Sequence, residues 1–441
     1  MTEAINNSYA SLGKFQRFYF YFLVLGLMAI SAFPLFMGKN QFLGYFAILM
    51  VGVVIYKPNI KKYLGFLAFY ALILLAQLLK FGSIYVMTAV MQFLSVLAAV
   101  LCFAVVSINF IPIFQKLMYW ICIISLVLFL PLLVYPGFSD IMLSKFPIHV
   151  TIVNEIYGNE EVVHNFLFIN YPSDFIYKVR NAGPFWEPAV FGGSLLISFA
   201  IAALEKRTIF SKHGFVVMAT ILTTFSTTTY LALLLFITFF YTFKIKSIIL
   251  RVGLMLGCLI GFFYIYSTVD FLGDKINEEF NEVSFDVVYQ GGNSRMASAY
   301  LDLVEVTETN FYFLFGRGGH PEFRVSTADK NVLRNNGLTD QLALWGIPFF
   351  IFFFYHFRKS WAAFCRVLDY PAGMSYFLLA IIWVISFSEP YYRYPFIWAM
   401  ALFGFTYDTY LDEKRRTERG QVLSRPQPDL TKFPVSASPQ R

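Results

Sequence analysis

The sequence predicts an all-α polytopic membrane protein with about 12 transmembrane helices, and three observations support this. The chain has 441 residues, of which 58% are hydrophobic and 20% aromatic, and its mean hydropathy is +0.61. Apolar runs close to the roughly 20 residues that a helix needs to cross a bilayer recur along most of the chain. Lysine and arginine collect at the ends of these runs, as in the cytoplasmic loops of membrane proteins. Membrane topology therefore explains the net charge of +7, and no nucleic-acid partner is expected.

The predicted transmembrane segments fall into two groups. Those before residue 210 are 18–37, 41–56, 63–79, 84–110, 117–134 and 188–204, and those after residue 245 are 248–269, 338–357, 374–388 and 395–410. Between the groups, residues 214–243 carry no charged side chain. One helix over that stretch would be about 45 Å long, too much for a single crossing. Because the hydroxyl residues 226–229 can bond to backbone groups instead, we predict two short helices or a re-entrant pair with a break there.

The distribution of basic residues supports that break. With the N-terminus in the cytoplasm, a single crossing would put Lys244, Lys246 and Arg251 outside, whereas two crossings return them to the cytoplasm. The predicted cytoplasmic loops carry these basic residues: Lys57, Lys61, Lys62, Lys116, Lys206, Arg207, Lys212, Lys244, Lys246, Arg251, Arg358, Lys359 and Arg366.

The same topology gives one transmembrane domain, residues 1–410, with two long loops on the outer face, 135–187 and 270–337. Residues 411–441 are basic and then rich in Pro, Ser and Gln, so we predict a disordered cytoplasmic tail.

The first candidate site lies where the first long loop meets a predicted helix. Pro188 suits the first position of a helix, and the positive end of the helix dipole would face the loop. Arg180 lies about two turns upstream, so a cation and a helix N-terminus converge where an anion can be held. An ordinary helix start with an interfacial arginine is the alternative interpretation. Glu187 is the best placed carboxylate for a catalytic base, and its alternative role is an ion pair with Arg180.

The second long loop supplies a similar arrangement. Arg295 lies in the first turn of a predicted amphipathic helix that should lie along the membrane surface, although an interfacial arginine is common there too. Downstream, Arg317 stands in a glycine-rich turn, 316–319, that can present backbone N–H groups to an anion or serve as a flexible linker. His320 suits acid–base work, or is only solvated.

Taken together, Arg180 and Arg295 offer what a lipid diphosphate needs: two guanidinium groups, two helix starts and an apolar surface for the tail. Glu389 and Arg393 lie in the short outer turn 389–394 and either complete this site or pair with each other. The outer loops show no Asp/Glu cluster of the metal-ligand type, so we expect neither a metal nor another cofactor.

The chain resembles the bacterial O-antigen polymerase (Wzy-type) and O-antigen ligase superfamily of polytopic glycosyltransferases over roughly residues 18 to 410. The resemblance rests on five short features: residues 180–193 entering a span, the break at 226–229, Ser294 before Arg295, the turn 316–319, and an Asn336-led helix ending at Gly346. One departure is Asn335, where the family often has histidine, so no histidine role carries over to that position and His320 is the candidate substitute.

The resemblance implies a GT-C-like fold in the bacterial inner membrane, with the outer loops and the active site in the periplasm. It implies metal-independent transfer from undecaprenyl-diphosphate-linked oligosaccharides, with Arg180 and Arg295 gripping the diphosphate, Glu187 and His320 as catalytic candidates, and Arg317, Asn336, Glu389 and Arg393 as accessory ones. Membrane lipid surrounds such an enzyme, and a chain-length regulator and a flippase are its expected partners.

Three functions remain open. The first is a polymerase that joins lipid-linked repeat units into O-antigen or a related surface polysaccharide. The second is a ligase that moves the finished glycan onto lipid A core or protein, which Asn335 mildly disfavours. The third is a non-enzymatic lipid or polysaccharide exporter, which two anion sites on one face fit poorly because an exporter needs access from both faces. Coupled transport is disfavoured, because the span interiors lack ionisable residues.

Overall fold

The computed structural model describes residues 12–135, 137–145, 149–154, 159–165, 170–172, 180–268, 295–319 and 336–407. In these residues α-helices predominate, as predicted. By length and composition, 4 helical stretches can cross a membrane: Lys14–Ala32, Lys39–Tyr56, Lys61–Val134 and Pro188–Lys206. Shorter apolar helices accompany them: Thr227–Thr242, Ile248–Cys258, Met374–Ser388 and Pro395–Tyr407. This composition is that of a membrane-embedded helical protein.

The N-terminal helices alternate with short 3-10 turns. The helices are α2 (Lys14–Ala32), α3 (Lys39–Tyr56), α4 (Leu64–Phe81), α5 (Val86–Val106) and α6 (Phe110–Val134). The turns between them are η1 (Pro34–Phe36), η2 (Lys61–Tyr63), η3 (Gly82–Tyr85) and η4 (Ser107–Asn109). The predicted span 84–110 therefore divides into η3, α5 and η4, and the regular helix α5 ends where Ser107 adopts φ +57°.

The first long loop contains a short helix, α7 (Phe138–Lys145), and a small antiparallel sheet that the all-α prediction did not include. Strands β1 (His149–Asn154), β2 (Asn159–Asn165) and β3 (Asn170–Pro172) pair in that order. The β-branched residues of β1 and β2 explain the sheet, since such side chains favour extended backbone.

The remaining helices form the C-terminal half. They are α8 (Pro188–Lys206), α9 (Lys212–Thr223), α10 (Thr227–Thr242), α11 (Ile248–Thr268), α14 (Arg295–Glu308), α15 (Asn310–Phe315), α16 (Gly337–Trp345), α17 (Ile347–Val367), α18 (Met374–Ser388), η7 (Tyr391–Arg393) and α19 (Pro395–Leu402).

The break in the uncharged stretch is confirmed. Helix α9 ends at Thr223, and the Ser226 hydroxyl caps α10 by accepting a hydrogen bond from the Thr229 N–H at 3.4 Å. A second break was not predicted: the expected span 338–357 is interrupted at Gly346, which has φ +75° and ends α16. A Cβ atom there would lie 2.7 Å from the carbonyl carbon of Leu314, so only glycine allows α15 to approach so closely.

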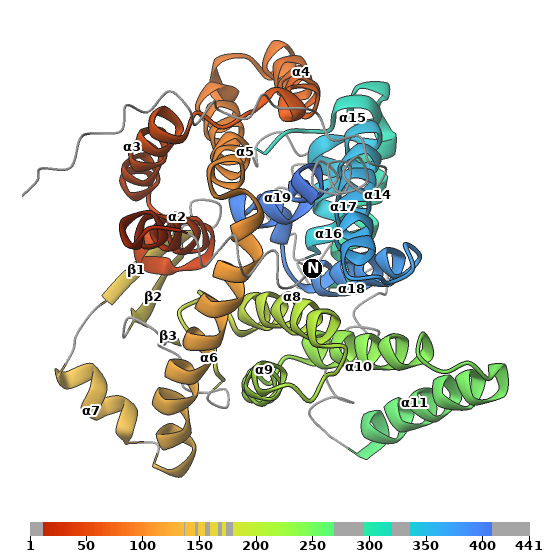
Figure 1. Ribbon diagram of the computed structural model, residues 1–441. Helices are drawn as coiled ribbons and strands as arrows, with labels where there is room; N and C mark the ends of the chain where they lie inside the picture. Colours follow the sequence, from red (N-terminus) through yellow and green to blue (C-terminus); the bar gives the residue numbers. More distant parts are fainter. Residues whose placement is uncertain are drawn as a thin grey trace, which may run out of the picture.

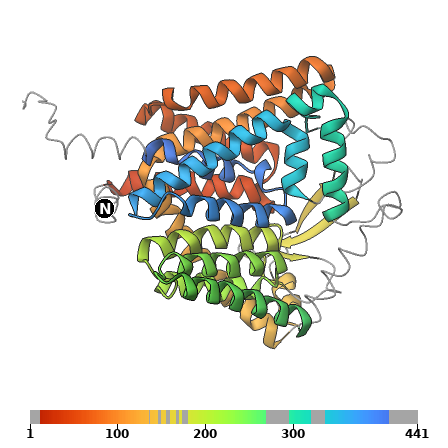
Figure 2. The same cartoon turned by 90° about the vertical axis from the view of Figure 1, so that its right-hand side faces the viewer.

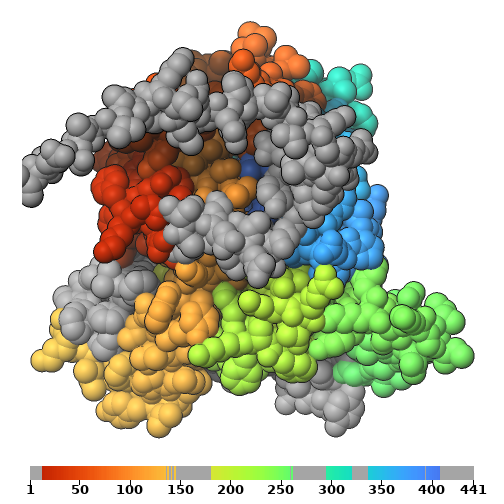
Figure 3. All heavy atoms as spheres, viewed as in Figure 1, coloured from red at the N-terminus to blue at the C-terminus, as the bar shows by residue number. Residues whose placement is uncertain are grey.

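The helices pack in two groups. Helices α8 to α11 form a lower layer, and α2 to α5 with α14 to α19 lie above it (Figure 1). The space-filling view shows the same division, with the green segments below the red and blue ones (Figure 3). In the perpendicular view the long helices run side by side, and α14, α15 and the small sheet gather at the end opposite the N-terminal label (Figure 2).

Contacts among the basic loops support the predicted topology. The Lys62 ammonium donates to the Thr406 hydroxyl at 3.0 Å, which joins the turn after α3 to the segment after α19. Arg207 lies 3.6 Å from Asp369, and Lys244 donates to the Arg207 carbonyl oxygen. Lys244 therefore lies at the same end of the bundle as the loops after α8 and α17, as two helices between residues 214 and 243 require.

Candidate functional site

The Arg180 side chain is fixed by the break between α9 and α10. Its Nε donates to the carbonyl oxygen of Thr224 at 3.2 Å. Next to it, the Asn181 amide donates to the Thr223 hydroxyl at 2.8 Å, while its oxygen accepts from the Ser125 hydroxyl at 2.7 Å and the Gly183 N–H at 2.9 Å. Carbonyls at the end of a helix have no partner in the helix itself, so the break supplies the acceptor that holds this loop.

Glu187 stands at the start of α8, as predicted, but its side chain does not cap the helix. Its backbone is extended, Pro188 takes the first helical position, and no side-chain capping hydrogen bond is made. The carboxyl group instead forms a hydrogen bond with the Glu389 carboxyl group. A direct hydrogen bond between two carboxyl groups requires a proton between them.

Glu389 follows the last residue of α18 and is 4% exposed. Burial raises the pKa of Glu389 well above its ordinary value, and the neighbouring Glu187 raises it further, while Arg295 and Arg180 oppose the shift. Glu389 therefore holds a proton under conditions in which an exposed carboxyl group is ionised.

The turn that carries Glu389 is docked on α8. The Tyr391 hydroxyl lies 2.6 Å from the carbonyl oxygen of Ala189 and 2.8 Å from that of Val190. A Cβ atom at Gly193 would lie 2.0 Å from this hydroxyl, so the glycine makes room for the ring. These contacts fix the position of Glu389 relative to the first turn of α8.

Arg295 completes the group from the second long loop. It is the first residue of α14, and its Nε donates to the Ser388 carbonyl oxygen at 3.4 Å, directly before Glu389. Burial lowers the pKa of Arg180, and its charge interacts with those of Glu187, Glu389 and Arg295. The structure thus brings both predicted arginines together with both carboxyl groups. A proton held on Glu389 reduces the negative charge that faces the two guanidinium groups.

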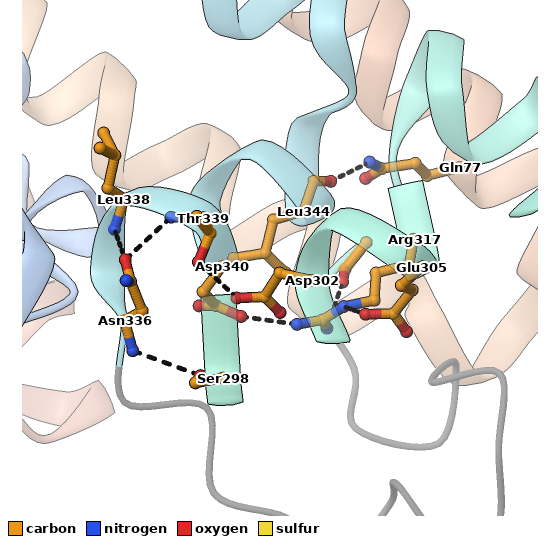
Figure 4. A network of polar contacts seen from close by, with 11 residues as sticks. Gln77, Ser298, Asp302, Glu305, Arg317, Asn336, Leu338, Thr339, Asp340 and Leu344 are labelled. Carbon is orange, nitrogen blue, oxygen red and sulfur yellow. Dashed lines mark hydrogen bonds and ion pairs between the residues drawn. The ribbon is translucent and has the colours of Figure 1, made fainter. Parts of the chain in front are cut away.

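Asn336 helps to position Arg295. Its side-chain oxygen caps α16 by accepting from the N–H groups of Leu338 at 3.1 Å and Thr339 at 3.2 Å (Figure 4). Its amide donates to the Arg295 carbonyl oxygen at 3.4 Å. Asn336 therefore ties the start of α16 to the start of α14 and acts through the backbone of Arg295.

Arg317 is not an accessory residue of this site, and that prediction is wrong. Its guanidinium group is 2% exposed, lies 2.8 Å from the Glu305 carboxylate and donates to Asp340 at 2.5 Å (Figure 4). Burial would lower the pKa of Arg317, but Asp340 and Glu305 raise it above its ordinary value. The sequence did not reveal this ion-pair cluster because its carboxylates come from two separate helices, α14 and α16.

Two backbone N–H groups of the glycine turn, 316–319, already form hydrogen bonds within the protein. They therefore cannot bind an anion as the sequence had suggested. The Arg317 N–H donates to the Ala343 carbonyl oxygen at 2.8 Å, and the Gly318 N–H donates to that of Leu344 at 3.3 Å. These are carbonyls at the end of α16 that lack a helical partner, so they take the donors that an anion would need.

Two further predicted residues are not placed. His320 lies outside the described residues, as does the side chain of Arg393. Comparison with known proteins identified no relative. No family model, curated protein or solved structure matches the chain.

Two carbonyl oxygens orient the arginines, those of Thr224 and Ser388, and the sequence predicted neither contact. It indicated Glu389 only as an accessory residue. Its only signal for Glu389 was an acidic residue directly after an apolar span and directly before a proline, in a turn that also contains arginine.

Proposed function

We propose that the chain is a membrane glycosyltransferase that uses an oligosaccharide linked to undecaprenyl diphosphate, and that it polymerises repeat units of O-antigen or a related surface polysaccharide at the periplasmic face of the inner membrane. The observation that carries this proposal is the convergence of Arg180, Arg295, Glu187 and Glu389 at the start of α8. Guanidinium groups suit a diphosphate because they can form paired, charge-assisted hydrogen bonds with its oxygens.

In this mechanism the arginines act on the leaving group. As the bond between the sugar and the diphosphate breaks, negative charge grows on the diphosphate oxygens. Arg180 and Arg295 stabilise that charge, and the N-terminus of α8 adds positive potential. Because both guanidinium groups are held by main-chain carbonyl oxygens, they are oriented before the substrate arrives.

The carboxyl pair acts on the attacking sugar hydroxyl. Glu187 is the partly exposed member of the pair and accepts the hydroxyl proton as the new glycosidic bond forms. Glu389 is the buried member and, by holding a proton, hydrogen-bonds to Glu187 and orients it.

The test is the replacement of each arginine by alanine in the source bacterium after deletion of the chromosomal copy. Ion-paired hydrogen bonds of this type are worth roughly 1.5–3 kcal/mol, so each variant should lose about ten- to a hundredfold in polymerisation. Lysine should restore only part of the activity, because it lacks the planar fork. Arg207→Ala, in an exposed ion pair at the other end of the bundle, is the matched control and should form normal chains.

The readout is the length distribution of the surface glycan, with expression of each variant confirmed. Normal long chains from Arg180→Ala or Arg295→Ala would remove that residue from the site. In a cell-free reaction with purified protein and lipid-linked repeat units, polymer formation supports the polymerase. Transfer only to lipid A core would support the ligase instead.

A further inference from the structure

A second feature of the bundle is a cavity of about 340 Å³ between α3, α4, α5, α16, η7 and α19. Its volume falls within the roughly 300–1,000 Å³ of small-molecule sites. Aromatic rings line one part of its wall: Tyr70, Trp345, Tyr392 and Trp398. Two of the rings, Trp345 and Trp398, lie 4.9 Å apart between centroids. The rings belong to the aromatic core of the bundle, so the wall is rigid.

Polar side chains line the rest of the wall and include Gln92, Ser95 and Gln341. The Gln92 oxygen accepts from the Tyr85 hydroxyl at 3.0 Å, and the Tyr85 hydroxyl also lies 2.5 Å from the oxygen of Gln77. These contacts fix the Gln92 amide. Gln341 is 2% exposed, and its side-chain oxygen has no hydrogen-bond partner within the described part of the chain. A buried acceptor without a partner is costly, so a ligand that donates to it is favoured.

This combination of groups distinguishes between classes of ligand. A hydrocarbon chain could pack against the rings but would leave the buried side-chain oxygen of Gln341 without a donor. A diphosphate would need several cations, and among the described residues that line the cavity Lys39 is the one that is cationic. A sugar ring has apolar C–H faces that pack on aromatic rings and hydroxyl groups around its edge that bond to amides. The lining therefore fits a neutral carbohydrate.

The cavity lies next to the turn that carries Glu389. Tyr392, in its wall, belongs to the same short turn as Glu389. On the opposite side, Gly337 packs so closely on that turn that a Cβ atom would lie 1.9 Å from the Glu389 carbonyl oxygen. Gln341 follows Gly337 by one helical turn, a rise of about 6 Å. A sugar held in the cavity would thus lie next to the turn that carries Glu389.

We propose that this cavity is a carbohydrate-binding subsite for the acceptor, the sugar whose hydroxyl attacks the lipid-linked donor. The inference rests on the proposed glycosyl transfer and adds the residues that would select the acceptor. Gln92 and Gln341 would bond to its hydroxyls, and Trp345 and Trp398 would contact its C–H face. The arginines would remain dedicated to the diphosphate of the donor.

The test measures binding of a free repeat-unit oligosaccharide, released from the surface polysaccharide of the source bacterium and lacking any lipid or diphosphate. The full-length protein is reconstituted in lipid nanodiscs, and tryptophan fluorescence is followed during titration. We expect a saturable change, because Trp345 and Trp398 lie in the cavity wall. Gln341→Leu and Gln92→Leu should each weaken binding about tenfold, the effect of one lost hydrogen bond. Trp398→Phe should lose most of the signal, whereas Trp120→Phe, a 59% exposed ring on α6, should retain it.

Each outcome separates the acceptor subsite from the diphosphate site. Arg180→Ala should bind the free oligosaccharide as the wild type does while failing to polymerise. Absence of any saturable change in the wild-type protein would overturn the subsite and leave the diphosphate site intact. A response to a short isoprenoid alcohol but not to the oligosaccharide would overturn it in favour of a lipid tail. If both glutamine variants bind normally, the amides do not recognise the ligand and the proposal fails.

Discussion

At the scale of single residues, the carboxyl pair at the start of α8 shows how burial assigns different roles to the same functional group. Glu389 is 4% exposed and keeps its proton, whereas Glu187 lies in a less buried position one hydrogen bond away. Two carboxyl groups in contact cannot both be ionised cheaply, so one proton between them is the stable arrangement. A base that is oriented by a protonated neighbour is ready to accept a proton from a substrate.

This arrangement predicts how stability depends on pH. The pKa of Glu389 is raised in the folded protein above its ordinary value of about 4.3. The stabilisation is therefore complete below that ordinary value and is lost as the pH rises through the raised pKa. We expect the melting temperature of the wild type to fall as the pH rises above that ordinary value. Glu389→Gln, which keeps the hydrogen-bonding amide but cannot ionise, should show a flatter profile, measured by thermal unfolding in detergent. Parallel profiles for both proteins would show that Glu389 does not titrate in this range.

A second prediction separates catalysis from structure at Glu187. Glu187→Gln should lower turnover about a hundredfold, as is typical for loss of a general base, and should change donor binding little. Activity and binding of the lipid-linked donor are measured on the same preparation, with Glu389→Gln as the matched variant. If Glu187→Gln instead loses donor binding or thermal stability while turnover of the bound donor is preserved, Glu187 is a structural partner of Arg180.

The sequence indicated Arg180, Arg295 and Glu187 as site candidates because each stands beside a predicted helix start. Proline and capping residues mark such starts in a sequence. It misassigned Arg317 because the partners of that residue, Glu305 and Asp340, lie on helices whose packing no local pattern reveals. Long-range pairing of charges is decided by tertiary structure, and this is the information that a single sequence carries least well.

At the scale of secondary structure, the breaks in helices are what place the functional groups. The end of α9 gives its carbonyl oxygens to Arg180 and Asn181, and the break at Gly346 lets the glycine turn pack on the end of α16. The first break was predicted because a long uncharged stretch carried hydroxyl residues at its middle. The second was not, because a lone glycine two residues before a proline in an apolar run has the same pattern whether it ends one helix or lies within a kinked one.

The element-scale prediction concerns the ion-pair cluster between α14 and α16. Arg317→Met leaves the buried Glu305 and Asp340 carboxylates without their cation and should cost about 3–5 kcal/mol, the typical loss on breaking a buried ion pair. The melting temperature of the purified protein would show this loss. As a control, Arg207→Ala removes a pair whose side chains are 64% and 82% exposed, and should change stability by about 1 kcal/mol or less. An unchanged melting temperature in Arg317→Met would mean that the cluster does not hold the two helices together.

At the scale of the whole molecule, hydropathy and charge predicted the predominantly helical architecture, because the bilayer imposes apolar helices on the segments that cross it. They did not predict the small sheet, which lies in a loop where the bilayer imposes no such constraint. They also did not predict the acceptor cavity, since its wall combines residues from five α-helices that are distant in the sequence: α3, α4, α5, α16 and α19.

The last prediction tests the orientation of the molecule. Contacts among Arg207, Lys244 and Asp369 place the basic loops at one end of the bundle, and the positive-inside rule assigns that end to the cytoplasm. In a variant without the native cysteines, of which Cys102, Cys122 and Cys365 are buried, Lys246→Cys should react with an impermeant thiol reagent only after the membrane is opened. Ser144→Cys, on α7 in the first long loop, should react in intact cells.

Labelling of Lys246→Cys in intact cells would reverse the orientation. The diphosphate site would then face the cytoplasm, and a periplasmic polymerase would be excluded. Equal labelling of both positions in intact cells would contradict the arrangement of the helices itself. The orientation matters for the chemistry because, outside the inner membrane, no nucleotide sugar is expected and a glycosyl donor must arrive on a lipid. The expected labelling pattern would therefore place the arginine pair on the side of the membrane where a lipid diphosphate is the donor available.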